Sequence, residues 1–164
     1  MTGRRTLAAG GGAWAGAAYV AIVFPVAFAL GTVRTLLVAP RLGDTLAVTI
    51  EAPLILVVSW LASAWCVRVF QIPPAVTPRL AMGGVGFGLL MLLELGLSVL
   101  LFGRTPGDYL AASLSRPGGI GLAAQLGFAL VPLVQMKRAV PGGRTSGASG
   151  PSPPPPTTRR PPGR

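Results

Sequence analysis

The sequence predicts an all-α integral membrane protein: a four-helix bundle with a short outer interfacial helix and a disordered C-terminal tail. Three observations predict this fold class. Of the 164 residues, 51% are hydrophobic and only 11% are charged, which is unlike the average soluble domain. Four apolar stretches are each long enough to cross a hydrocarbon core, which takes about 20 helical residues. The 14 basic residues, against 4 acidic ones, lie between these stretches and in the tail, as expected of residues that set membrane orientation.

The four spans form a transmembrane domain over residues 15–138. They are expected at residues 15–38, 45–67, 80–102 and 119–136. Three of them contain a proline, namely Pro25, Pro53 and Pro132. A proline within a span is tolerated because neighbouring helices can satisfy the carbonyl that it frees. The carbonyls freed here belong to Ala21, Thr49 and Phe128.

The beginning of the chain also has features of an export signal. Arg4 and Arg5 precede the first apolar stretch, and Ala27-Phe28-Ala29 mimics a cleavage site. The apolar character continues to Val38, however, which is longer than a signal peptide requires, and further membrane segments follow. We therefore expect the first span to stay uncleaved.

The positions of the basic residues predict the orientation, because cytoplasmic loops of membrane proteins are enriched in Lys and Arg. With four spans, ten basic residues fall on one side, and only Arg34, Arg41, Arg104 and Arg116 fall on the other. Residues 1–14 and 139–164 are therefore expected in the cytoplasm. Arg outnumbers Lys and Asn is absent, a bias typical of high-GC bacterial genomes. The expected location is thus a bacterial inner membrane.

The two segments outside the spans differ in character. In the outer loop, Thr105 is a suitable N-cap, with Pro106 at N1 and Asp108 at N3, so a short interfacial helix is expected to run to about Ser115. From Ala139 onward the chain consists mainly of Pro, Gly, Ser, Thr and Arg and cannot bury a core. We expect a solvated tail that is weakly attracted to anionic lipid, with a polyproline partner as the alternative.

Four ionisable or amide side chains lie in the outer half of the predicted spans, where an unpaired charge costs roughly 2.5 kcal/mol or more. They are Arg34, Glu51, Glu94 and Gln125. All four lie at a similar depth, with the two glutamates about 9 to 12 Å below the outer boundary. With the second and third spans as antiparallel neighbours, the four are expected to meet in one outer-leaflet cluster. Arg34 would then neutralise one glutamate, and the other would bond Gln125, become protonated or contact water.

Two functions fit such a polar cluster. A buried Arg–Glu pair or a Glu–Gln hydrogen bond can simply fix helix pairing, as in a structural or accessory membrane component. Alternatively, Glu51 and Glu94 are the titrating groups of a small proton- or cation-coupled transporter. The first function is our leading hypothesis, because the chain has too few polar groups to line a complete aqueous path.

Other classes of function are disfavoured by what the sequence lacks. There is no histidine, and Cys66 is the only cysteine, which excludes Cys/His metal sites, His-based acid–base catalysis and an intramolecular disulfide. We expect no enzymatic activity, no metal and no cofactor. Nucleic-acid binding is not expected either, because the basic residues form no surface patch.

Small residues recur at four-residue spacing in two spans, a pattern that allows close helix contact in membranes. The predicted contact residues are Gly83, Gly84, Gly88, Gly119, Ala123 and Gly127. The expected partners are therefore the lipid bilayer and, through such faces, a second copy of the chain or another membrane protein.

The chain resembles an uncharacterised family of small four-span bacterial membrane proteins over about residues 15 to 136. The resemblance rests on Leu30-Gly31-Thr32-Val33-Arg34, Pro40-Arg41-Leu42-Gly43, Glu51-Ala52-Pro53, Ser59-Trp60, Arg79-Leu80-Ala81-Met82-Gly83 and Glu94. It implies an architecture and no reaction. Small multidrug transporters are similar in size, but their essential glutamate lies in the first helix. The first span here has none, so their proton–drug exchange is not carried over.

Overall fold

The computed structural model describes residues 2–139, and the side chains of residues 11–136. All regular structure in this part of the chain is helical. The elements are α1 (Thr2–Val33), the π-helical segment η1 (Arg34–Val38), α2 (Ala39–Leu42), α3 (Asp44–Val69), α4 (Val76–Leu100), α5 (Pro106–Ser113) and α6 (Arg116–Ala139). Four segments are long and apolar enough to cross a membrane: Gly11–Leu42, Asp44–Val69, Val76–Leu100 and Arg116–Met136. The all-α, four-span fold class is thereby confirmed, while the predicted tail lies outside the described residues.

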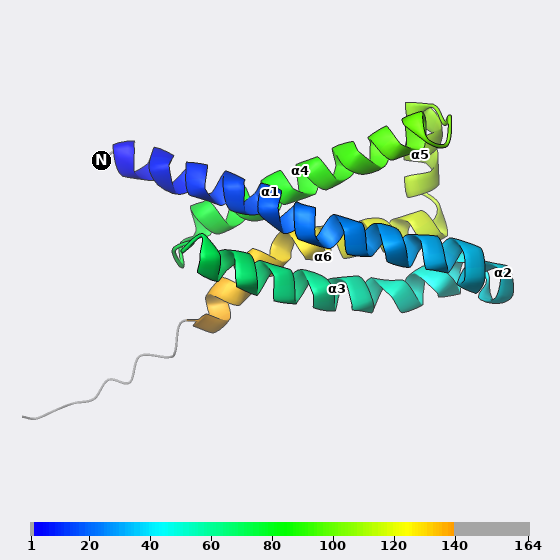
Figure 1. Cartoon of the computed structure of the whole chain (residues 1–164), viewed down its shortest axis with the longest axis horizontal. Helices are drawn as coiled ribbons and strands as arrows, with labels where there is room; N and C mark the ends of the chain where they lie inside the picture. The colour runs from blue at the N-terminus through cyan, green and yellow to red at the C-terminus, as the bar shows by residue number, and fades with distance from the viewer. Residues whose placement is uncertain (1, 140–164) are drawn as a thin grey trace, which may run out of the picture.

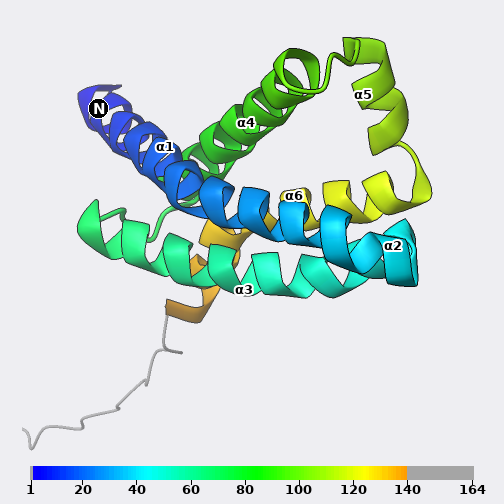
Figure 2. The ribbon, with the colours of Figure 1, turned by 45° about the vertical axis from the view of Figure 1, so that its right-hand side comes forward.

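The four long helices form a bundle in which α1 and α6 each pack against both α3 and α4 (Figures 1 and 2). The pairs α1/α6 and α3/α4 therefore lie across the diagonals. The expectation that the second and third spans are neighbours is wrong. Residues 70–75, which include Pro73 and Pro74, join α3 to α4 across a diagonal. We call this end of the bundle the loop end and the opposite one the α5 end.

Arg79 fixes the loop end through main-chain carbonyls. Its side chain is buried, with only 5% exposed, although the sequence places it among the loop residues that set orientation. The guanidinium donates to the carbonyls of Ile72, Pro73 and Pro132 at 3.3, 3.4 and 3.5 Å. Because Ile72 and Pro73 belong to the connection and Pro132 to α6, Arg79 ties the connection to α6.

The first span contains one wide turn that the sequence analysis did not foresee. In η1 the hydrogen bonds skip one extra residue, as in the bond from the Ala39 N–H to the Arg34 carbonyl. Pro40 follows at the start of α2, and its ring would clash with the carbonyl four residues earlier in a regular α-helix. The wide turn relieves this clash, and Gly43, with φ of +79°, ends the span.

The core of the bundle contains Tyr19, Met82, Phe128 and Cys66, whose side chains are fully buried. The rings of Tyr19 and Phe128 stack with centroids 4.2 Å apart, across the α1/α6 diagonal. The Tyr19 hydroxyl donates to the Phe128 carbonyl at 3.0 Å, which is the carbonyl freed by Pro132. The prediction that a neighbouring helix satisfies it is confirmed, and those for Ala21 and Thr49 stay predictions.

The close helix contacts involve other small residues than most of those predicted. Gly12 and Gly16 of α1 lie close to α4, since a Cβ on them would lie 2.6 Å from the carbonyl oxygens of Pro78 and Met82. Gly83 lies directly against the carbonyl of Ala129.

Two of the six predicted contact residues make such contacts, and the other four do not. Gly127 resembles Gly83 in this respect, because its Cβ would lie 2.8 Å from a methyl carbon of Leu56. Gly84, Gly88 and Gly119 face open space, and Ala123 is exposed. These four make no close helix contact within the described part of the chain, because four-residue spacing does not say which face of a helix meets a neighbour. Their role in contacts with a second copy or another membrane protein stays a prediction.

α5 begins with the predicted cap. Thr105 Oγ1 accepts from the Asp108 N–H at 3.2 Å, and Asp108 Oδ2 accepts from the Thr105 N–H at 3.0 Å. This reciprocal pair is a capping box. The helix ends at Ser113, two residues before the expected position.

The cap should be visible in the titration of Asp108. Hydrogen bonds from the Thr105 side chain and backbone lower the pKa of this carboxyl below its usual value of 3.8. A lowered pKa in the folded state stabilises the helix above pH 3.8, and this stabilisation is lost as the pH falls through the folded value. Carbon-13 NMR of the Asp108 carboxyl should therefore give a midpoint below 3.8. In the Thr105→Val variant the midpoint should rise, and an unchanged midpoint would contradict the assignment.

Candidate functional site

A cavity of about 740 Å³ lies at the α5 end of the bundle and is lined by residues of α1, η1, α3, α4, α5 and α6. Its walls are mainly apolar. The polar cluster residues predicted from the sequence all line it, namely Arg34, Glu51, Glu94 and Gln125.

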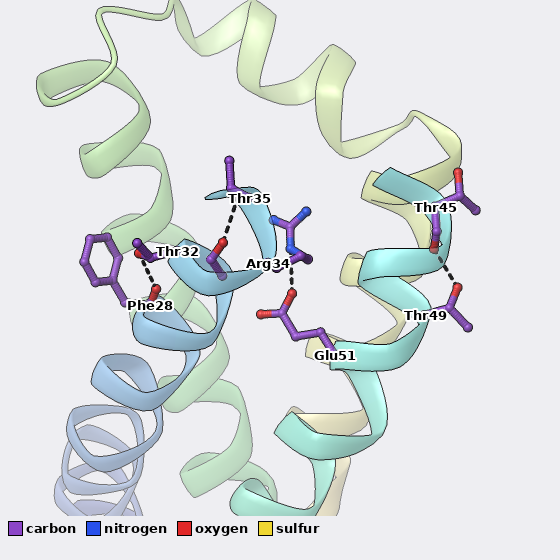
Figure 3. A network of polar contacts seen from close by, with 8 residues as sticks. Phe28, Thr32, Arg34, Thr35, Thr45, Thr49 and Glu51 are labelled. Carbon is purple, nitrogen blue, oxygen red and sulfur yellow. Dashed lines mark hydrogen bonds and ion pairs between the residues drawn. The ribbon is translucent and has the colours of Figure 1, made fainter. Parts of the chain in front are cut away.

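The first pair in the cavity joins η1 to α3. Arg34 Nε lies 2.6 Å from Glu51 Oε2, and the two side chains are 27% and 18% exposed (Figure 3). The nitrogen makes no well-directed hydrogen bond among the described residues, so the contact is an ion pair. Opposite charges of this kind, partly shielded from water, largely compensate each other.

The second pair joins α4 to α6 and has no cation. Gln125 Nε2 donates to Glu94 Oε1 at 2.6 Å, and the Tyr109 hydroxyl of α5 donates to Glu94 Oε2 at 3.2 Å. Among the described side chains, Glu94 has no ion-pair partner. Both of its hydrogen bonds come from neutral donors that can orient a carboxylate without cancelling its charge.

The structure therefore arranges the four predicted residues as two pairs on the walls of one cavity. Tyr109 was not predicted as part of the site. The sequence signal for its role is the tyrosine hydroxyl itself, because a partly buried tyrosine usually needs a hydrogen-bond partner. The pKa of Tyr109 is raised by burial and by the nearby negative charge of Glu94.

The loop end has a separate polar contact that the sequence analysis also missed. Ser63 donates to Gln135 Oε1 at 2.9 Å, and Gln135 Nε2 donates to the Trp60 carbonyl at 2.8 Å. These bonds join α3 to α6. None of the described residues on the loop-end side of Val23, Ile55, Leu90 or Phe128 lines the cavity, so the cavity does not continue to the loop end.

No group of three or more His, Cys, Asp or Glu residues that could hold a metal ion occurs within the described part of the chain. Glu51 and Glu94 each have their own side-chain donors, and the exposed Asp44 also lines the cavity. What this arrangement can do chemically is to bind a positively charged group, or a proton, at Glu94.

The resemblance noted from the sequence agrees with the structure in architecture, because the chain is an integral membrane protein with four spans. Comparisons of the chain with protein-family models, with curated proteins and with solved structures found no match.

Proposed function

We propose that this chain is a non-enzymatic protein of a bacterial inner membrane that binds a cation in the cavity at the α5 end, with Glu94 as the anionic group. One observation carries this proposal. Arg34 compensates Glu51 at 2.6 Å, while Glu94 is held by the neutral donors Gln125 and Tyr109. With both glutamates ionised, Glu94 is therefore a negative charge on the cavity wall that has no ion-pair partner among the described residues, while the exposed Asp44 and Arg104 also line the cavity.

An uncompensated carboxylate is expensive at this depth. Placing an acidic side chain in a membrane interior costs roughly 2.5 kcal/mol or more unless it finds partners. The two neutral donors offset part of this cost, and a proton or a bound cation offsets the rest. Glu94 therefore favours a positively charged occupant of the cavity.

Binding from the α5 end is the simplest activity that this arrangement supports. The tight packing at the loop end blocks a path through the bundle, so proton- or cation-coupled transport requires a second conformation in which the loop end opens. The second candidate function is a structural one, in which the polar pairs fix how the helices pack. It is favoured by the Arg34–Glu51 ion pair, which joins η1 to α3 and fixes how these segments pair.

The orientation belongs to the same proposal and can be tested with reporter fusions. With both termini in the cytoplasm, the α5 end faces outward. Alkaline phosphatase should be active when fused after Asp108, and inactive after Gln71 or at the C-terminus. An active C-terminal fusion would contradict the orientation.

Removing the charge of Glu94 tests the cation site. The chain has two tyrosines: Tyr109 donates to Glu94, and Tyr19 is buried in the core and does not line the cavity. In lipid nanodiscs with carbon-13-labelled tyrosine, ethylammonium at constant ionic strength should shift the ring resonances of Tyr109 and leave those of Tyr19 unchanged. Glu94→Gln should abolish the shift and change the melting temperature little, since it retains the shape and most hydrogen bonds.

The matched control is Asp108→Asn, which removes an exposed acid next to Tyr109. This variant should keep the wild-type response. An ethylammonium shift that survives in Glu94→Gln, or no shift of Tyr109 in the wild type, would refute the cation site.

A further inference from the structure

The cavity has a lateral opening between α1 and α4. These helices touch at Gly12 and Gly16 and diverge toward the α5 end (Figures 1 and 2). Phe28 of α1 and Phe102, just beyond α4, line the cavity and are nevertheless 47% and 67% exposed. In a membrane, an opening between two spans faces lipid rather than water.

The α1 wall of this opening offers no free hydroxyl donor to a ligand. Thr32 and Thr35 lie there, but their hydroxyls donate to the carbonyls of Phe28 and Gly31 within the same helix, each at 2.8 Å (Figure 3). Their donors are therefore used locally. Leu97 contributes a further apolar side chain from α4.

The size of the cavity indicates more than a small ion. A volume of about 740 Å³ is in the range of pockets that hold organic molecules. A bound metal ion or ammonium would occupy only the corner at Glu94 and would leave the apolar walls uncovered. The cavity combines one anionic group with an extended apolar wall that opens to lipid. A single ligand with a cationic part and an apolar part would match both features.

We infer that the ligand is an amphiphilic amine, with its cationic head at Glu94 and its hydrocarbon chain in the opening between α1 and α4, reached sideways from the lipid. This inference rests on the proposed cation site. Charge complementarity at Glu94 selects this ligand over the bilayer phospholipids, because a phosphate placed beside Glu94 would be repelled and Arg34 is already paired with Glu51. Arg104 also lines the cavity, but it is exposed. An ammonium head can donate to the Glu94 carboxylate.

The test compares three probes in phosphatidylcholine nanodiscs, again through the Tyr109 resonances. Decylammonium has the head and the chain, ethylammonium has the head with a short chain, and decan-1-ol has the chain with a neutral head. Decylammonium should shift Tyr109 at a concentration at least about tenfold lower than ethylammonium, because the chain concentrates it in the lipid from which it binds. Decan-1-ol should produce no shift.

Two variants test the lateral route. Ala27→Trp places an indole in the opening, because Ala27 lines the cavity, whereas Ala29→Trp adds the same group to an exposed position of the same helix outside it. Ala27→Trp should weaken the decylammonium response about tenfold and spare the ethylammonium response, and Ala29→Trp should spare both. Leu97→Trp fills the opening from α4 and provides the same test if Ala27→Trp fails to fold, as judged by the Tyr19 resonances.

The outcomes separate this inference from the proposed function. If ethylammonium shifts Tyr109 but decylammonium shifts it no better, or if neither filled variant weakens the decylammonium response, the amphiphile is refuted and the cation site stands. If decan-1-ol acts like decylammonium, the cavity binds hydrocarbon chains without regard to charge, and the inference is overturned. If neither amine shifts Tyr109, the proposed function itself fails.

Discussion

Replacing Gly83 by alanine should destabilise the bundle by about 3 kcal/mol, even though alanine is normally the better residue in a helix. A Cβ at this position would collide with the main-chain carbonyl of Ala129 on α6, and a backbone group cannot turn aside as a side chain can. α4 and α6 would have to separate. The free energy of unfolding, measured by reversible titration with dodecyl sulfate in mixed micelles, should show the loss.

The adjacent glycine provides a matched control for this prediction. A Cβ at Gly84 meets no atom within 4 Å, so Gly84→Ala should leave stability unchanged or raise it by up to about 1 kcal/mol. Equal effects of the two substitutions would contradict the α4–α6 contact described here.

Replacing Arg34 by alanine should also destabilise the bundle by about 3 kcal/mol, for an electrostatic reason. The substitution leaves the Glu51 carboxylate, whose side chain is 18% exposed, without its cation at membrane depth. The same unfolding titration measures the effect. Adding Glu51→Gln to Arg34→Ala should restore most of the stability, because it removes the charge that was left unpaired.

Glu94→Gln serves as the reference for this prediction. It should alter stability little, because Glu94 has no cationic partner among the described residues and the substitution therefore leaves no charge unpaired. If Arg34→Ala proves as mild as Glu94→Gln, or if Glu51→Gln fails to rescue it, the ion pair does not stabilise the bundle.

Hydropathy was sufficient to predict the four spans, because crossing a bilayer imposes a minimum length on every apolar helix. The capping box of α5 was also predictable, since Thr105 and Asp108 interact over three residues of one chain. The rise per residue of a helix was enough to predict that Arg34 and Glu51 lie at a common depth. In the structure Arg34 Nε lies 2.6 Å from Glu51 Oε2.

Neighbour relations between helices were not predictable in the same way. Hydropathy does not specify which spans pack together, so the diagonal position of α3 and α4 had no signal in the sequence. For the same reason Gly12 and Gly16 were overlooked, although they have the four-residue spacing of small residues, and Gly84 and Gly88 were chosen instead. The role of Tyr109 depends on how α5 lies over the cavity, which is a tertiary feature.

The diagonal path of residues 70–75 divides the chain into two helical hairpins, one of α1 and α3 and one of α4 and α6. Each hairpin turns at the α5 end, through η1 and α2 or through α5, and each holds its own polar pair, Arg34–Glu51 or Glu94–Gln125. The hairpins meet through Tyr19–Phe128 and Ser63–Gln135, nearer the loop end. Rotation of one hairpin against the other about this base would therefore change the width of the cavity without breaking either polar pair.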